Sequence, residues 1–425
     1  MNTFWYFLYN ILIVPLLKLY FILASPFNEK IRAGIRDRKK LFENLIIDLT
    51  GLDRRKKMVW FHSASMGEFE QAKPIIEKIK KDKNVNILIT FFSPSGYRNS
   101  LNYPYADVIS YIPLDTTFLS GRFLNFTRPD IAVFMRYDFW PNMLWQLDYR
   151  KIPYFIVDAT MRKSSKRMLP LSKNFHRSLL KNVAAVLTVS DEDKKNFEEL
   201  GIKNEKIKSV GDTRFDRVYQ KSLQAKEKKL FKDGFFNEKK VFVIGSSWEN
   251  DEEVIIPVVI KLIKYDPNLI IIIVPHEPTI PRIEKIENLF LNNSPTIRFS
   301  YLNNYNNERV IIIDSIGILL TLYCYADVAY VGGSFKQGIH NVLEPAVYGI
   351  PVVFGPKIDN SREAGQLVEK GGGFIVNNKR QAYRVLRKLF SDDGFRQKAG
   401  KICSDFVKQN IGATEKIINE INSYI

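Results

Sequence analysis

The chain has 425 residues, of which 45% are hydrophobic, so it is long enough for two domains with sizeable cores. Its formal net charge of +17 favours acidic partners such as nucleic acid, an anionic membrane or a phosphorylated substrate, although a soluble lysine-rich surface gives the same balance. Two cysteines and four scattered histidines, none in a metal-binding or redox spacing, argue against a disulfide scaffold and a zinc site.

Residues 4–24 form an apolar, aromatic stretch that is about long enough to span a bilayer. Asn10, Pro15 and Lys18 interrupt it, so a helix that lies in the membrane interface is the alternative. Six basic residues follow: Lys30, Arg32, Arg36, Arg38, Lys39 and Lys40. The positive-inside rule places this flank in the cytoplasm, where it would meet anionic headgroups. We expect membrane anchorage here rather than a buried core helix.

Short apolar runs then alternate with helical patterns, which is typical of parallel α/β folds. The expected strands are 58–62, 86–91, 108–112, 131–135, 153–157 and 185–189 in a first set, then 241–244, 269–274, 310–313, 328–331 and 350–354 in a second. The lysine-rich residues 220–240 between the two sets are expected to form a solvated linker, and helices are expected from about Gln381 to the end.

Glu68 follows the first expected strand and stands at the start of a helical pattern. Ligand chemistry in α/β folds lies at the carboxyl ends of strands, so Glu68 is a candidate for catalysis. A glutamate that complements the helix dipole is the alternative, and on spacing alone it is the better supported one.

A second candidate site begins where the expected strand 328–331 runs into Gly332 and Gly333. Asn341 stands where a helix N-cap is expected, and the helix would end near Gly349. Free N–H groups and a helix dipole at such a turn bind anions, and Glu344 could accept hydrogen bonds from ribose hydroxyls. The pattern therefore favours a phosphorylated, sugar-bearing ligand over a plain tight turn.

Both stretches resemble motifs of the Kdo transferases, lipopolysaccharide glycosyltransferases with a GT-B fold. Residues 65–68 are similar to the family's Ser-x-Gly-Glu, and residues 332–345 to its Gly-Gly-Ser followed by His-Asn-x-Leu-Glu-Pro. The resemblance covers nearly the whole chain. It implies an α/β fold with two Rossmann-like domains facing across a cleft, and an N-terminal membrane-associated helix. The implied divisions are a membrane segment 1–40, an acceptor domain 41–219, a linker 220–240, a donor domain 241–400 and a helix 401–425 that packs back on the first domain.

The resemblance also implies roles for single residues. Glu68 would be the catalytic base. The CMP of the donor would contact His276, Glu277, Ile316, Gly317, Ile318, Asn341, Val342, Leu343 and Glu344. Further donor or phosphate contacts would be Ser246, Ser247, Gly333 and Ser334, and acceptor contacts would be Ser65, Gly67, Ser93 and Arg136.

Three segments depart from the family's pattern. Arg136 and Asp138 stand where the family has two glutamates, so Arg136 would meet a phosphate instead. His276-Glu277 replaces an Arg-His pair, and the acidic residue that usually follows the 316–317 position is missing. From the residues alone, a structural histidine at 276 and a capped helix start after Ser247 remain the alternatives.

The implied function is inverting transfer of Kdo, an eight-carbon acidic sugar, from CMP-Kdo to a phosphorylated lipid A precursor. It would take place at the cytoplasmic face of the inner membrane, without a cofactor or a metal, and without a nucleic-acid partner. Two alternatives are another GT-B nucleotide-sugar enzyme, such as a UDP-sugar transferase or an epimerase, and a basic protein that binds membrane or nucleic acid. No RNA-binding motif supports the last reading. The oligomeric state is left open.

Overall fold

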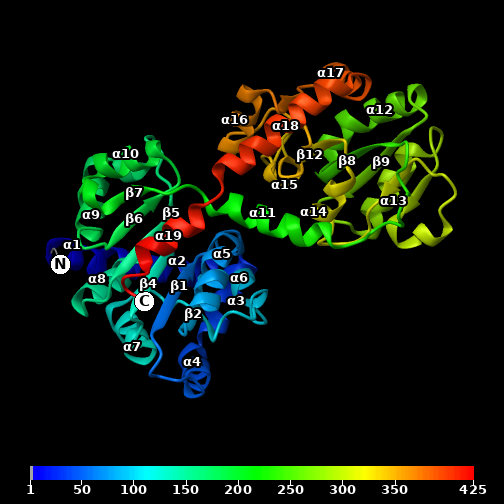
Figure 1. Ribbon diagram of the computed structural model, residues 1–425. Coiled ribbons are helices and arrows are strands. Elements are labelled where there is room, and N and C mark those ends of the chain that lie inside the picture. The colour runs from blue at the N-terminus through cyan, green and yellow to red at the C-terminus, as the bar shows by residue number, and fades with distance from the viewer. Residues whose placement is uncertain (1–2) are drawn as a thin grey trace. The chain divides into compact units, whose positions relative to one another are not determined.

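A computed structural model describes residues 3–425 of the chain. The chain divides into two compact units (Figure 1): Met1–Arg217 with Ile411–Ile425, and Val218–Asn410. Each unit contains a sheet of seven parallel strands with helices packed on it. The two Rossmann-like α/β domains expected of a GT-B chain are therefore present, together with an apolar helix at the N-terminal end.

The first sheet has the strand order β3-β2-β1-β4-β5-β6-β7. Its strands are β1 (Met58–Ser63), β2 (Asn86–Phe91), β3 (Val108–Tyr111), β4 (Ile131–Met135), β5 (Tyr154–Ala159), β6 (Ala185–Thr188) and β7 (Ile207–Ser209). Strand order reverses between β1 and β4, which pair directly with Phe61 opposite Val133. In sheets of this kind, ligands bind beside the carboxyl ends of strands at such a switch point.

The second sheet has the order β10-β11-β9-β8-β12-β13-β14. Its strands are β8 (Lys240–Ser247), β9 (Leu269–Pro275), β10 (Thr296–Arg298), β11 (Val310–Ile312), β12 (Val328–Val331), β13 (Val352–Phe354) and β14 (Gly373–Ile375). Here the order reverses between β8 and β12, with Tyr330 opposite Ile244. Each unit therefore has one switch point, and each candidate motif lies at one of them.

The helices of the first unit are α1 (Thr3–Leu8), α2 (Val14–Ala24), α3 (Glu29–Arg38), α4 (Leu41–Thr50), α5 (Met66–Asp82), α6 (Pro94–Arg98), α7 (Thr117–Thr127), α8 (Pro141–Tyr149), α9 (Pro170–Leu179), α10 (Asp191–Leu200) and α19 (Ala413–Ile421). Three short ones are η1 (Tyr9–Ile13), η2 (Lys166–Met168) and η3 (Asn204–Lys206). Because side chains alternate along a strand, Trp60 of β1 packs in the core with α7 and α8, whereas Val59 and Phe61 pack with α5 and α19.

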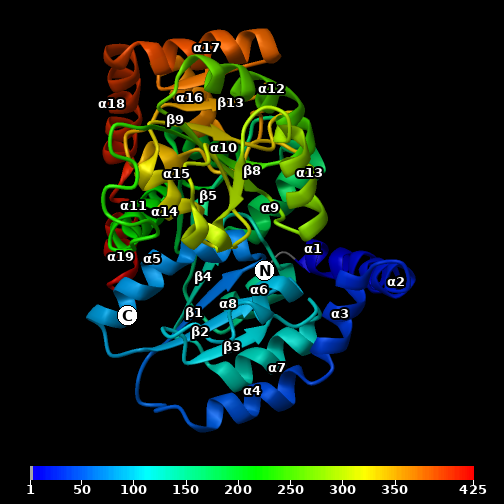
Figure 2. The same cartoon turned by 90° about the vertical axis from the view of Figure 1, so that its right-hand side faces the viewer.

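Helix α11 (Thr213–Lys226) leaves the first unit and enters the second. The helices of the second unit are α12 (Glu249–Tyr265), α13 (Ile280–Phe290), α14 (Leu319–Leu322), α15 (Leu343–Ala346), α16 (Arg362–Lys370), α17 (Lys379–Ser391) and α18 (Asp393–Asn410), with the short η4 (Phe299–Asn304) and η5 (Tyr323–Tyr325). Figure 2 shows α17 and α18 along the outer side of this unit.

Two local expectations are not met. The helix expected from Asn341 to Gly349 has only four residues, because the chain tightens into turns after Ala346 and Gly349 takes a φ of 75°. Within the stretch 220–240, expected to be solvated, Phe231 is buried and packs with Tyr325 and Phe299. Burying the large aromatic side chain of Phe231 stabilises the second unit, whereas a solvated position would leave it in water.

Candidate functional site

Glu68 lies on the first turn of α5, just beyond the carboxyl end of β1. The N–H of Ala64 donates to Glu68 Oε2 over 2.6 Å, which holds the carboxylate across the turn. Burial and the nearby negative charge of Asp138 raise the pKa of Glu68, against the lowering effect of the Ala64 bond, His62 and Arg136. A raised pKa suits a carboxylate that has to accept a proton near neutral pH.

Asp138 follows β4, the strand beside β1, and joins a small polar cluster at the switch point. Its Oδ2 lies 2.8 Å from Nε2 of the buried His62 and accepts a bond from Trp140 Nε1 over 2.9 Å. His62 Nδ1 lies 2.8 Å from Thr90 Oγ1 on β2. The cluster ties the ends of β1, β2 and β4 together beside Glu68.

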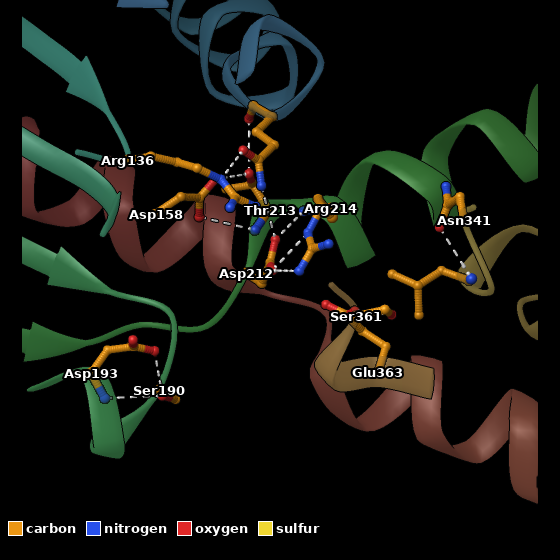
Figure 3. Close-up of polar contacts among 12 residues, drawn as sticks. Arg136, Asp158, Ser190, Asp193, Asp212, Thr213, Arg214, Asn341, Ser361 and Glu363 are labelled. Atoms are coloured by element: carbon orange, nitrogen blue, oxygen red, sulfur yellow. Dashed lines mark hydrogen bonds and ion pairs between the residues drawn. The ribbon is translucent and has the colours of Figure 1, made fainter. Parts of the chain in front are cut away.

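Arg136 follows β4 and has partners inside the first unit. Its Nε donates to Gln71 Oε1 on α5 over 2.8 Å, and its charge lowers the pKa of both Asp158 and Asp212 (Figure 3). Asp158 is fully buried, and burial followed by the charge of Asp212 raises its pKa. Arg136 therefore compensates buried carboxylates, and its use as a phosphate contact remains a prediction.

Backbone strain marks the same strand ends. Arg136 and Asp158 have φ values of 61° and 51°, and Ser246 at the end of β8 has 51°. Such values are uncommon for residues with a side chain and concentrate at functional sites. The pairing of β5 and of β8 with their neighbours shifts register at these positions, between Ile156 and Ala159 and between Gly245 and Ser247.

The remaining acceptor candidates lie around Glu68 in the same unit. Ser65 precedes α5 and Gly67 is exposed on its first turn. Ser93 Oγ accepts the N–H of Gly96 over 3.1 Å and so caps α6. The Ser93 hydroxyl thus has a structural partner already, and its contact with an acceptor remains a prediction.

The switch point of the second unit carries three stacked rings that no sequence motif had indicated as a group. Trp248 Nε1 donates to His340 Nε2 over 2.9 Å, and the two rings are 4° from coplanar. His276 stacks on both, with ring centroids 4.5 Å from Trp248 and 4.6 Å from His340. Burial and His276 lower the pKa of His340 to about 4, so it is a neutral hydrogen-bond acceptor at physiological pH.

The turn at Gly332 and Gly333 after β12 is closely packed, and an N–H group in it has a partner inside the unit. A side chain at Gly332 would meet the main-chain oxygen of Ser246 at 2.2 Å, and one at Gly333 would collide with His340. The N–H of Gly333 donates to Asp251 Oδ2 over 2.8 Å. An internal carboxylate thus accepts one of the N–H groups that we expected to face a ligand, and the four-residue α15 offers little dipole, so an anion contact at this turn remains a prediction.

Two of the serines expected as phosphate contacts form hydrogen bonds within the second unit. Ser247 donates to Glu252 Oε1 over 2.7 Å and is buried. Ser334 accepts the N–H of Gly355 over 2.6 Å and is buried as well. Ser246 is half-buried at a strained position, so it is the serine of this group best placed to meet a ligand.

The expected nucleotide contacts divide into exposed and buried residues. Ile316, in the loop after β11, is 86% exposed, and His276 and Glu277 are exposed too. Asn341 Nδ2 donates to Glu344 Oε1 over 3.1 Å. Gly317 is exposed and Ile318 half-buried. Val342 and Leu343 bury their side chains, so only their main chains are available to a ligand.

Sequence reasoning missed Trp248, His340 and Asp251 as members of the second site, and His62 and Asp138 as members of the first. The available signal was that His62 ends an expected strand and that the other four lie within ten residues after one. Within residues 3–425, no group of three or more His, Cys, Asp or Glu side chains is arranged to hold a metal ion.

Comparisons with known proteins agree on a family. A family model described as 3-Deoxy-D-manno-octulosonic-acid transferase (kdotransferase) matches residues 35–217. The 3-deoxy-D-manno-octulosonic acid transferase of Aquifex aeolicus is 30% identical over 343 residues, which is 79% of this chain and 87% of the relative. That of Haemophilus influenzae is 26% identical over 436 residues, 99% of each chain.

Two further matches differ in extent. A bifunctional glycosyltransferase/methyltransferase of Fusobacterium nucleatum is 29% identical over 84% of this chain, which spans 57% of that relative. The crystal structure of UDP-GlcNAc 2-epimerase from Neisseria meningitidis, bound to UDP-GlcNAc, is similar with a TM-score of 0.61 and 16% identity over 86% of this chain and 100% of that one. At this identity the likeness shows the fold alone.

Proposed function

Since the chain belongs to the 3-deoxy-D-manno-octulosonic acid (Kdo) transferase family, we propose that this glycosyltransferase moves Kdo from CMP-Kdo to a phosphorylated lipid A precursor. The transfer inverts the anomeric centre, needs no metal and takes place at the cytoplasmic face of the inner membrane. The observation that supports the proposal most is Glu68, anchored at the carboxyl end of β1 with a raised pKa.

In the proposed reaction, a glucosamine hydroxyl of the acceptor attacks the anomeric carbon of Kdo. The new carbon–oxygen bond forms as the bond to the CMP phosphate breaks, and the hydroxyl proton passes to Glu68. Asp138 and His62, which contact each other at the β1–β4 switch point, lie beside the Glu68 carboxylate. Their charges set how readily Glu68 takes the proton.

For the donor, we propose a site at the carboxyl ends of β8, β9, β11 and β12. The rings of Trp248, His276 and His340 offer a stacking surface of the kind that suits a nucleotide base. The exposed Ile316 would cover one side of the ligand. Glu344, whose pKa burial raises, would receive the ribose hydroxyls together with Asn341.

The test is transfer of Kdo from CMP-Kdo to lipid A precursor by the membrane-bound protein, measured for wild type and for Glu68→Gln. We expect the variant to keep its fold and its affinity for CMP and to lose at least about 100-fold in turnover, since general base catalysis contributes on that order. Glu43→Gln, at an exposed carboxylate on α4, is the matched control and should be fully active.

Comparable turnover by Glu68→Gln would remove Glu68 from the role of base. Loss of activity in a chelator such as EDTA would overturn the metal-free part of the proposal, and retention of the configuration in the product would overturn inversion.

A further inference from the structure

Residues 3–24 of the first unit form one continuous apolar segment through α1, η1 and α2. By length and composition this segment is able to cross a membrane, yet only 11% of its most apolar window is buried. A narrow stripe of it faces the unit, with Tyr9 and Val14 buried. The opposite side presents a row of large apolar side chains to the exterior: Phe4, Phe7, Ile11, Leu12, Leu16, Leu19, Ile22 and Leu23.

The stripe is held by specific polar contacts within the unit. Tyr9 donates its hydroxyl proton to the buried Asp115 over 2.9 Å. Asn10 and Asn142 exchange two amide hydrogen bonds of 3.0 Å. These bonds tie the segment to the folded first unit, because the buried Asp115 and Asn142 lie at the starts of α7 and α8.

Contacts with the same unit continue to both ends of the segment. Trp5 meets Phe175 of α9 with ring centroids 5.5 Å apart, and Phe21 meets Phe92 at 6.3 Å. Sixteen residues of helix between Trp5 and Phe21 cover about 24 Å. The segment therefore lies alongside the unit over nearly all its length, and Figure 2 shows α1, α2 and α3 together on one side of it.

We propose that this segment does not cross the bilayer but lies in the plane of its cytoplasmic interface, with the exposed apolar row buried among the lipids. A spanning helix needs about 30 Å of length inside the hydrocarbon. Because the segment is bonded to α7, α8 and α9 along that length, a spanning arrangement would carry Asp115 and Asn142 into the hydrocarbon, which is strongly unfavourable. In-plane binding buries the same apolar row among the lipids and leaves Asp115 and Asn142 outside the hydrocarbon.

The occupant of this face is an anionic lipid surface rather than a protein partner, as the adjoining charges indicate. α3 follows α2 after a short turn and forms, with α6, a cavity of about 300 Å³. Its basic lining residues are Lys30, Arg32, Arg36 and Arg98, and Glu29 is its only acidic one. A phosphate-bearing headgroup complements this pocket, because juxtamembrane basic residues are attracted to anionic membranes.

The arrangement also connects the membrane face with the candidate acceptor site. Phe92, which Phe21 contacts, packs on Trp140 with ring centroids 4.8 Å apart. Trp140 in turn donates to Asp138 beside Glu68. Three side chains, Phe92, Trp140 and Asp138, thus connect the in-plane segment with the proposed base, although the topology of the segment does not depend on the proposed reaction.

Topology is tested by labelling single cysteines with a membrane-impermeant maleimide in the full chain. Thr3→Cys and Lys39→Cys lie at the two ends of the region, and the parent chain gives the background from Cys324 and Cys403. We expect both cysteines to react in inverted inner-membrane vesicles and neither in intact spheroplasts. Reaction of Thr3→Cys in spheroplasts would show a spanning helix and overturn the proposal, as would recovery of the chain in the soluble fraction.

Lipid binding is tested by flotation with vesicles of phosphatidylcholine, with and without phosphatidylglycerol. Leu12→Glu with Leu19→Glu should lower the bound fraction at least about tenfold, whereas Leu291→Glu, at an exposed leucine of the second unit, should not. Arg32→Glu with Arg36→Glu should abolish the preference for phosphatidylglycerol. Undiminished flotation of the first variant, or an unchanged lipid preference of the second, would contradict the proposed surface.

Discussion

The indole N–H of Trp248 donates to Nε2 of His340 over 2.9 Å, and this bond assigns the imidazole proton of His340 to Nδ1. The two residues come from the loops after β8 and β12, so the bond joins both sides of the switch point. A neutral histidine of fixed tautomer, stacked on His276, forms a rigid surface at the place where we propose that the nucleotide binds.

Trp248→Phe tests this relationship, because phenylalanine keeps the stacking surface and removes the hydrogen bond. We expect the His340 imidazole to populate both tautomers, which nitrogen chemical shifts report. The affinity for CMP should fall by at most about five-fold, because one hydrogen bond of about 1 kcal/mol no longer holds the proposed binding surface in one arrangement. An unchanged tautomer in the variant would show that Trp248 does not set it.

Asp138→Asn should move the pH dependence of the reaction. The pKa of Glu68 is raised by burial first and by the charge of Asp138 second. Removing that charge lowers the pKa of Glu68, so the base is ionised at lower pH and the acidic limb of the kcat/KM profile moves to lower pH. Asp148→Asn, at a carboxylate bonded to Asn182 away from the cluster, is the control and should leave the limb in place. A shift to higher pH would contradict this account of the site.

The central strands of both sheets and the two motif-bearing turns were predictable from sequence. Apolar runs such as those of β1, β8 and β12 report burial directly, and Glu68 and Asn341 were found because they follow such runs. The three-residue strands β7, β10 and β14 were not expected. All lie at or next to a sheet edge, where pairing with a neighbouring strand rather than local pattern creates the strand.

Contacts between separate loops were beyond the reach of the sequence. The Trp248–His340 bond joins residues 92 positions apart, and the bond from Gly333 to Asp251 joins residues 82 apart. Periodicity shows which side of an element is buried, but it does not show which loop end meets which. For that reason the interpretation of the glycine turn as an anion site did not include Asp251, which accepts the N–H of Gly333.

Asp115 should make stability depend on pH. It accepts the N–H groups of Asn142 and Met143 and the Tyr9 hydroxyl, and burial raises its pKa to about 6. Between about pH 4, where an unfolded aspartate ionises, and about pH 6, the folded protein retains a proton that the unfolded chain has lost. The free energy of unfolding therefore falls as pH rises through this window, by about 3 kcal/mol for this group.

Denaturant unfolding of Asp115→Asn at several pH values checks the sign of this effect. The difference in unfolding free energy between wild type and variant should shrink as pH rises from about 4 to about 6, since only the wild type loses stability through this group. A difference that grows over the same window would contradict the raised pKa.

Asp216 on α11 caps the distant helix α19. Its carboxylate accepts the N–H groups of Gly412 and Thr414 and the Thr414 hydroxyl, each over 2.6 Å. Asp216→Ala should cost about 2–4 kcal/mol, since several charge-assisted bonds to a helix start are lost together. Asp216→Asn, which keeps one acceptor oxygen, should cost less. Amide hydrogen exchange in residues 413–421 should quicken in the same order, and unchanged exchange in the alanine variant would contradict the capping role.

Because α19 belongs to the first unit, that unit consists of two separate segments of the chain, and the whole second unit lies between them in the sequence. Ile417, Ile418 and Ile421 of α19 complete the core against α5 and are translated after the whole of the second unit. During synthesis on the ribosome, one face of the first sheet therefore stays uncovered until the second unit has been translated. Premature termination after residue 410 would leave a product with an exposed apolar flank on its first unit, and such a product is a substrate for chaperones and proteases.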